Sequence, residues 1–166
     1  LVFIFWLAKL KRILKKLNDR KKIIIGSDHA GFEMKHSIIS NLSDIEFDDI
    51  GTDSDESVDY PDYAHNVVKG ILSNSYSFGV LICGSGIGMS MSANRAKDIR
   101  AALCLNTKMA ELARQHNDAN ILVLGSRLIS VSEAIKCLLV FLNTNFEGGR
   151  HQGRLNKFNN VNYNIT

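Results

Sequence analysis

The sequence predicts an α/β fold: a Rossmann-like three-layer α/β/α sandwich with a five-stranded parallel sheet. Five short apolar runs alternate along the chain with segments of helical periodicity, which is the pattern of βα units. The runs are continuously apolar, as expected of parallel strands that are buried on both faces. With 166 residues, of which 45% are hydrophobic and 22% charged, the chain suits one packed globular domain.

The first βα unit begins at Lys22. Lys22-Ile-Ile-Ile-Gly26 is a β-branched run closed by glycine, which is typical of a buried strand. Apolar residues then recur at helical spacing from Phe32 to Leu42. A weaker strand is expected over 45–50, and it ends at Gly51.

The middle of the chain supplies the second and third helices. Residues 52–59 form an acidic loop, and Pro61 suits the first turn of the helix that follows, which extends to Leu72. The third strand is expected over 78–83. It leads directly into a glycine-rich segment that opens a helix through about Arg95.

The last units repeat the alternation. The expected elements are strands at 99–105 and 120–125, a helix around 109–113, a helix over 130–142 and a short helix starting near Gly149. Ser130 stands three residues before Glu133, which is the spacing of a capping box. The five units predict helices on both faces of one parallel sheet.

Residues 1–20 differ from the rest of the chain. The apolar run at residues 1–8 is much shorter than the ~20 residues that cross a bilayer. The segment behind it, residues 9–20, reads as a basic amphipathic helix. Two interpretations stay open: a membrane-surface helix or anchor remnant, or an over-extended start that is not native. We expect the second, with no membrane partner and one self-sufficient domain at 21–166.

The net charge of +3 is local. Eight lysines and arginines lie in residues 9–22 beside a single acid, Asp19, and the rest of the chain is slightly acidic. A nucleic-acid partner is therefore not expected. The three cysteines have no C-x-x-C spacing and an odd count, which argues against a disulfide framework and a cysteine-rich zinc site. This cysteine usage fits a reducing cytoplasm.

A glycine loop follows the third strand, where α/β folds bind ligands. Gly84, Gly86 and Gly88 free backbone N–H groups to face one concavity at a helix N-terminus. Such a loop suits a phosphate or a developing oxyanion. It matches neither the dinucleotide-binding fingerprint nor the Walker loop, and a tight turn made for packing is the alternative.

Titratable residues surround this loop in the predicted sheet. Cys83 stands where the strand meets the loop, and both the amides and the helix dipole there favour a thiolate. Cys104 and Cys137 look like core residues, and a structural role stays open for Cys83 too. His29 and His116 are each ambiguous between a structural hydrogen bond and a functional role.

Two arginines near the C-terminus suggest the ligand class. Arg150 and Arg154 are four apart, so on a helix they share one face and suit a dianion. A solvated basic face is the alternative, but the double glycine at 148–149 suggests controlled placement. The ligand expected from these features is a small phosphorylated molecule.

Seven ordered blocks between about Lys21 and Phe158 resemble type B ribose-5-phosphate isomerases, the family that also contains the galactose-6-phosphate isomerase subunits. The blocks are Gly26-Ser-Asp-His-Ala-Gly-Phe32, Asp59-Tyr-Pro61, Cys83-Gly-Ser-Gly-Ile-Gly88, Ala93-Asn94, Arg114-Gln-His-Asn-Asp118, Gly125-Ser-Arg127 and Glu147-Gly-Gly-Arg-His-Gln152. The resemblance implies interconversion of ribose 5-phosphate and ribulose 5-phosphate through a cis-enediolate, with neither a metal nor an organic cofactor.

The resemblance also assigns the catalytic steps. Cys83 falls on the base that moves a proton from C2 of the sugar to C1, and Ser85 on the hydroxyl that helps move a proton between O1 and O2. His116, with Asp28, falls on the pair that opens the furanose ring. Many relatives have threonine at the position of Ser85. One branch uses a glutamate later in the loop, and residues 87–90 contain no acid, so the chain falls in the cysteine branch.

The remaining family positions bind the substrate. The groups that hold the enediolate are Asn117 and the amides of Gly84, Gly86 and Gly88. The phosphate-binding set is His29, Arg127, Arg150 and Arg154, and Tyr60 lines the pocket. His151 lies within the phosphate block without an assigned role.

The resemblance implies that the protein is a homodimer or a dimer of dimers, in which a neighbouring chain completes each pocket. Two other functions stay open. The first is isomerisation of a six-carbon sugar phosphate such as allose or galactose 6-phosphate, since one extra carbon is a matter of pocket length. The second is a non-catalytic sugar-phosphate sensor on the same fold.

Overall fold

The computed structural model describes residues 22–158. The predicted extension at residues 1–20 lies outside the described residues. Five parallel strands form one sheet in the order β2-β1-β3-β5-β4, which confirms the predicted fold class. The strands are β1 (Ile23–Ser27), β2 (Phe47–Asp49), β3 (Gly79–Cys83), β4 (Ala101–Leu103) and β5 (Ile121–Gly125).

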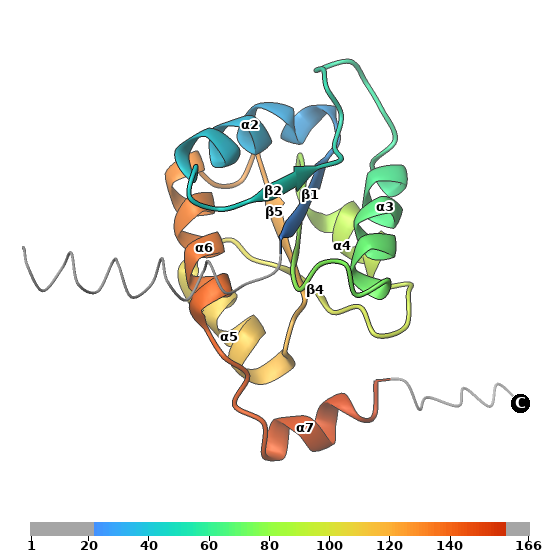
Figure 1. The fold of residues 1–166 in the computed structure, drawn as a ribbon, viewed down its shortest axis with the longest axis vertical. Coiled ribbons are helices and arrows are strands. Elements are labelled where there is room, and N and C mark those ends of the chain that lie inside the picture. The colour runs from blue at the N-terminus through green and yellow to red at the C-terminus, as the bar shows by residue number, and fades with distance from the viewer. Residues whose placement is uncertain (1–21, 159–166) are drawn as a thin grey trace, which may run out of the picture.

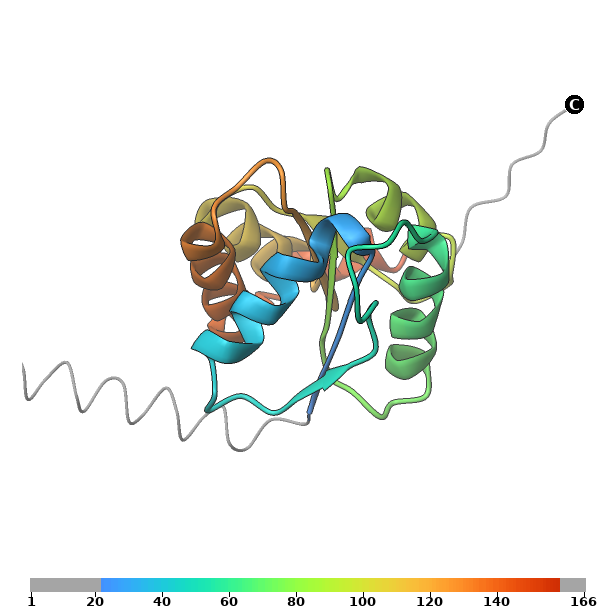
Figure 2. The same ribbon diagram turned by 90° about the horizontal axis from the view of Figure 1, so that it is seen from above.

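Helices cover both faces of the sheet (Figures 1 and 2). They are α2 (Phe32–Asn41), which follows the 3₁₀ turn η1 (His29–Gly31), then α3 (Tyr60–Leu72), α4 (Ile87–Ala93), α5 (Thr107–Asn117), α6 (Val131–Asn143) and α7 (Arg150–Leu155). Two core clusters separate the layers: α2, α5 and α6 pack on one face of the sheet, and α3 and α4 on the other. This distribution is the one that right-handed crossovers dictate for this strand order.

The centre of the sheet carries the core. All five residues of β1, β3 and β5 are buried, as their continuously apolar sequences predict for strands covered on both sides. Most of this burial comes from β-branched and leucine side chains such as Ile25, Leu81 and Val123. Among the described helices, none is both long enough and apolar enough to cross a membrane.

The two edge strands are shorter than predicted. The runs at 45–50 and 99–105 suggested strands of normal length, but β2 and β4 each have only three residues. An edge strand pairs on one side only, so its flanks lose the ladder sooner than those of a central strand. Beyond the ladder, the Arg100 N–H donates to the Asn120 side chain.

The predicted capping box at α6 forms only in part. Ser130 caps the helix by accepting from the Glu133 N–H at 3.2 Å. The Glu133 carboxylate accepts instead from the Thr107 N–H at the start of α5, at 3.3 Å. Because α5 packs against α6, this carboxylate satisfies a free amide of the neighbouring helix rather than one of its own.

A fully buried lysine fastens β2 to α2. The side chain of Lys35 has no exposed surface, and its ammonium donates to both carboxylate oxygens of Asp49 at 2.7 and 2.8 Å. It also donates to the Thr52 carbonyl at 2.9 Å, where the acidic loop begins. A buried ammonium needs such partners, because a charge without them is costly in the protein interior.

We expect an asymmetry between the two halves of this ion pair. Asp49→Asn leaves the buried ammonium of Lys35 without its counter-charge and should lower the free energy of unfolding by about 3 kcal/mol. Lys35→Met fills the same space and leaves a carboxylate that is 30% exposed, so its cost should be about half as large or less.

Chemical denaturation of both variants measures this difference. Lys108→Met is the matched control, because Lys108 pairs with Glu111 on the surface, and its effect should stay within about 0.5 kcal/mol. Equal losses in Asp49→Asn and Lys35→Met would contradict the assignment.

Candidate active site

A cavity of about 360 Å³ opens at the carboxyl ends of β1, β3 and β5. The chain leaves the neighbouring strands β1 and β3 in opposite directions, so the cavity lies at the switch point where α/β sheets bind ligands. Eight of the predicted site residues line it, together with Ala30 and Leu128: Asp28, His29, Tyr60, Cys83, Gly84, Ser85, Gly88 and Arg127.

The glycine loop wraps around the sulfur of Cys83. The Gly86 N–H donates to Sγ at 3.1 Å, and a donor at that distance stabilises negative charge that gathers on sulfur. Gly86 has φ of +75°, and a Cβ there would lie 2.4 Å from the Leu103 side chain. Both the backbone and the space therefore require glycine. The Ser85 hydroxyl accepts from the Ile87 N–H at 3.3 Å.

The end of β5 fixes this loop in place. The Ser126 N–H donates to the Cys83 carbonyl at 2.9 Å, and the Arg127 N–H donates to the Gly84 carbonyl at 3.0 Å. The Ser126 hydroxyl reaches across to the Ala30 carbonyl at 2.7 Å. A Cβ on Gly84 would come within 3.3 Å of the Arg127 guanidinium, so the missing side chain lets this cation lie directly on the loop.

The first strand contributes an acid and a histidine. Asp28 is buried, and its carboxylate caps η1 by accepting from the Gly31 N–H at 3.0 Å. His29 Nδ1 accepts from the Val58 N–H at 3.2 Å, which leaves the ring proton on Nε2. Val58 belongs to the acidic loop, so this hydrogen bond ties that loop to a residue that lines the cavity.

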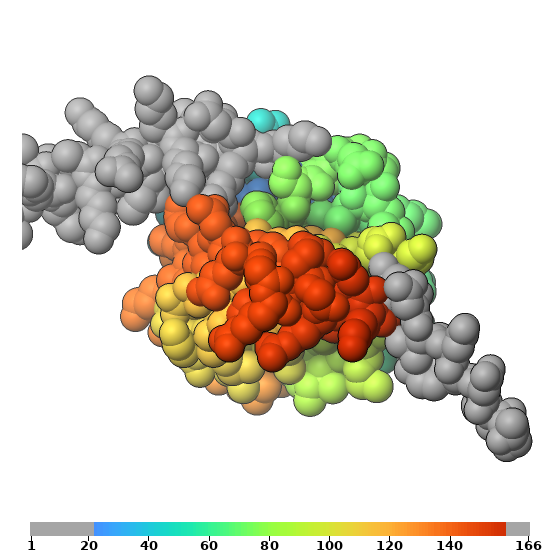
Figure 3. Space-filling model, turned by 90° about the horizontal axis from the view of Figure 1, so that it is seen from below, coloured from blue at the N-terminus to red at the C-terminus, as the bar shows by residue number. Residues whose placement is uncertain are grey.

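Gly86 belongs to the glycine loop beside this cavity, and the other four predicted site residues lie at the opposite edge of the sheet. His116 and Asn117 end α5, which leads into β5, so they lie at the amino end of that strand. Arg150 and Arg154 belong to α7, which lies beside α5 across the same face (Figure 3). A five-residue strand such as β3 spans about 16 Å, so within one chain His116 and Asp28 are far apart.

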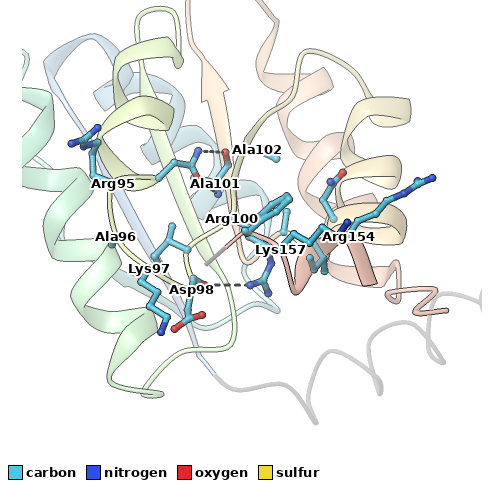
Figure 4. Close-up of a pocket in the computed structure, with 15 residues that line it drawn as sticks. Arg95, Ala96, Lys97, Asp98, Arg100, Ala101, Ala102, Arg154 and Lys157 are labelled. Atoms are coloured by element: carbon cyan, nitrogen blue, oxygen red, sulfur yellow. Dashed lines mark hydrogen bonds between the residues drawn. The ribbon is translucent and has the colours of Figure 1, made fainter. Parts of the chain in front are cut away.

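A larger cavity of about 860 Å³, which the sequence did not predict, lies at this amino edge (Figure 4). The loop between α4 and β4 and the helix α7 line it, and Asn117 and Arg154 take part. Its charged residues are the cations Arg95, Lys97, Arg100, Arg154 and Lys157 and one acid, Asp98. The balance of charge suits an anion.

Arg114 explains why the 114–118 block has this composition. It is buried, and its guanidinium donates to the Asp118 carboxylate at 2.8 Å and to the Ala119 carbonyl at 2.6 Å. It also lies 4.8 Å from the centre of the Phe78 ring. Asp118 ends α5 with a left-handed backbone, so the pair fixes the end of the helix that presents His116.

Two histidines stack at the amino edge. The rings of His116 and His151 are nearly parallel, with centres 4.3 Å apart and planes at 8°. The Glu147 carboxylate lies 3.7 Å from His151 Nε2 and 4.0 Å from His116 Nε2. Burial lowers the pKa of His151, and the neighbouring His116, Arg150 and Arg154 lower it further, whereas Glu147 raises it.

The donor atoms of His116, Glu147 and His151 lie within 4.8 Å of one another, which raises the question of a shared metal ion. The lone pairs of an imidazole lie in its ring plane. In two stacked parallel rings these directions run side by side and do not converge on one point. The arrangement therefore does not fit a common ion, although histidine and glutamate are ordinary metal ligands.

Comparison with known proteins identifies the family. A model of the ribose/galactose isomerase family matches residues 23–158. Ribose-5-phosphate isomerase B of Escherichia coli is 43% identical over 137 residues, which cover 81% of this chain and 92% of that protein. The crystal structure of a ribose 5-phosphate isomerase from Thermotoga maritima is 55% identical, with a TM-score of 0.83, and covers 85% of this chain and 99% of its own.

A ribose 5-phosphate isomerase B from Anaplasma phagocytophilum is 51% identical, with a TM-score of 0.78, and the match covers 84% of this chain and 97% of that one. The family model spans both groups of site residues, and these matches confirm the resemblance predicted from the seven sequence blocks. The chain belongs to the ribose/galactose isomerase family.

Proposed function

We propose that this protein interconverts D-ribose 5-phosphate and D-ribulose 5-phosphate through a cis-enediolate, with Cys83 as the base. The observation that carries the proposal is the cavity at the carboxyl edge. There the Gly86 N–H donates to Cys83 Sγ, and the guanidinium of Arg127 packs against Gly84 of the same loop. Relatives that share the family fold bear the name ribose-5-phosphate isomerase B.

The proposed reaction needs a base that removes a proton from C2 and groups that manage proton transfer and charge at O1 and O2. Cys83 removes the proton from C2, the C–H electron pair forms the C1–C2 double bond, and the electrons of the C1 carbonyl move to O1 as negative charge. Ser85 helps pass the hydroxyl proton of O2 to O1, the C2–O2 double bond forms, and the C1–C2 electron pair takes the proton back from Cys83 at C1. The amides of the glycine loop stabilise the negative charge that develops on oxygen, because they face it without reorganisation.

We infer that two copies of the chain build each site. Asp28, His29 and Arg127 of one copy face the substrate at the Cys83 cavity, while His116, Asn117, Arg150 and Arg154 come from the amino edge of another. An uncovered apolar surface beside the cavity supports this: Met91 on α4 is 68% exposed, and Ile87 and Leu128 are exposed as well. A dimer or a dimer of dimers follows from this division.

The other two cysteines are unsuited to the role of base. Burial raises the pKa of Cys104 to about 12 and that of Cys137 to about 11. Both thiols therefore stay protonated at neutral pH, and both belong to the core cluster between the sheet and α2, α5 and α6. All three cysteines are free thiols, which agrees with the proposed cytoplasmic location.

We expect iodoacetamide to alkylate Cys83 first in the native protein. Cys83 is only 5% exposed, but it lines the cavity, whereas Cys104 and Cys137 lie in the core with raised pKa values. Peptide mass spectrometry after short exposure measures the order, and the unfolded protein, which should label at all three positions, is the control. Earlier labelling of either core cysteine would contradict the assignment.

We expect Cys83→Ala to lower kcat for ribose 5-phosphate by about 10³-fold or more while the melting temperature stays close to that of the wild type. Cys104→Ala is the control and should keep most of the turnover.

A chelator should leave the wild-type rate unchanged. Full activity of Cys83→Ala would refute the base, and higher kcat/KM for a six-carbon sugar phosphate would refute the substrate. Tight binding without turnover would favour the sensor.

We expect two inactive variants to restore activity when they are mixed. Cys83→Ala and Arg154→Ala each spoil one half of the site. In a mixed dimer one of the two sites receives both intact halves, so an equal mixture should recover about a quarter of the wild-type rate. Native mass spectrometry verifies the exchange of chains. Mixed dimers without recovered activity would show that both groups act from the same chain.

A further inference from the structure

His151 is buried and its ring is stacked on that of His116, but it has no role in the reaction described above. We propose that His151 is a positioning residue: its ring is the platform that holds the imidazole of His116 in place for opening the furanose ring. The inference rests on the proposed function, in which His116 delivers a proton to the ring oxygen of ribose 5-phosphate.

The two rings differ in their access to solvent. The side chain of His151 is 6% exposed and that of His116 is 37% exposed. Because the planes are nearly parallel, His151 covers the inner face of His116 and leaves the outer face open. The stack fixes the plane of the exposed imidazole, which a residue at the end of a helix would otherwise reorient freely.

The backbone around Glu147 explains why this stack forms. The Glu147 N–H donates to the Gln115 carbonyl at 3.0 Å, which ties the chain to the end of α5. Gly148 and Gly149 follow with φ of +66° and +54°. A Cβ at either glycine would touch nothing within 4 Å, so the dihedral angles and not the space require glycine there. This turn brings His151 back beneath His116.

Charged groups surround the two stacked rings. Glu147 faces both imidazoles, and Arg150 Nε lies 3.5 Å from His151 Nε2. Burial lowers the pKa of His151, and His116, Arg150 and Arg154 lower it further, whereas Glu147 raises it. Two stacked rings at 4.3 Å disfavour a double positive charge.

The step that His116 performs then balances. Its imidazolium gives a proton to the ring oxygen O4, the bond between C1 and O4 breaks, and the hydroxyl proton on O1 passes to Asp28 of the other copy. The product is the open-chain aldehyde that Cys83 acts on. Misplacement of the acid by about 1 Å is enough to slow such a transfer by about 10²-fold.

The test compares His151→Ala, which removes the platform, with His151→Phe, which keeps a flat ring and loses both nitrogens. From ribose 5-phosphate we expect kcat to fall by about 10- to 100-fold in His151→Ala and by less than about threefold in His151→Phe, with little change in KM. Gln152→Ala, on the exposed side of α7, is the matched control and should behave like the wild type.

A second assay separates ring opening from the enediolate step. Ribulose 5-phosphate cannot close to a furanose, because the phosphate occupies its O5. Exchange of its C1 proton with D₂O, measured by NMR, therefore needs Cys83 but not His116. We expect this exchange to stay within about threefold of the wild type in both His151 variants and to disappear in Cys83→Ala.

Three outcomes would overturn the proposal: equal damage in His151→Phe and His151→Ala, equal loss of C1 exchange and turnover in His151→Ala, or full turnover in His151→Ala. Absence of C1 exchange in the wild type would instead refute the proposed function. If His151→Ala does not fold, His151→Leu, which fills the volume without a flat ring, takes its place, and the NMR signals of the His116 ring report its orientation in His151→Phe.

Discussion

All strands of the sheet run in the same direction, and this constraint divides the chemistry of the chain between two edges. Each strand delivers its last residues to the carboxyl edge, so Asp28, Cys83 and Arg127 meet there. Each crossover helix returns the chain to the amino edge, so His116 ends up beside α7. Within the described part of one chain, the length of the strands separates these two groups. The proposed function therefore requires an association of chains, and the exposed apolar side chains beside the cavity are available for it.

At the carboxyl edge, backbone hydrogen bonds do most of the positioning. Amides after β5 donate to carbonyls of Cys83 and Gly84, and Ser126 links β5 to the segment after β1. Three neighbouring strands are thus joined just beyond the regular ladder. Glycine is needed where chains approach closely, as at Gly31, where a Cβ would lie 2.5 Å from the Ile82 carbonyl oxygen. Rigid surroundings of this kind hold the sulfur and the amide donors in register.

The sequence allowed prediction of the fold class and the five strands, because short continuous β-branched runs such as Ile23–Ile25 are typical of buried parallel strands. It did not allow prediction of the lengths of β2 and β4, which depend on one-sided pairing, or of the partner of the Glu133 carboxylate, which lies on another helix. The separation of His116 from Asp28 follows from the order of elements, because a helix that precedes a parallel strand ends near the amino end of that strand. The stack on His151 does not, because it depends on the dihedral angles of two glycines.

The buried lysine has a consequence beyond the stability of the domain. Lys35 anchors the start of the acidic loop through the Thr52 carbonyl, and the same loop returns to hold the imidazole of His29 through the Val58 amide. The stability of the domain and the placement of His29 are therefore coupled through one buried cation. In the proposed function, in which His29 faces the substrate, a substitution at Lys35 would change both thermal stability and substrate affinity, although Lys35 does not line the cavity.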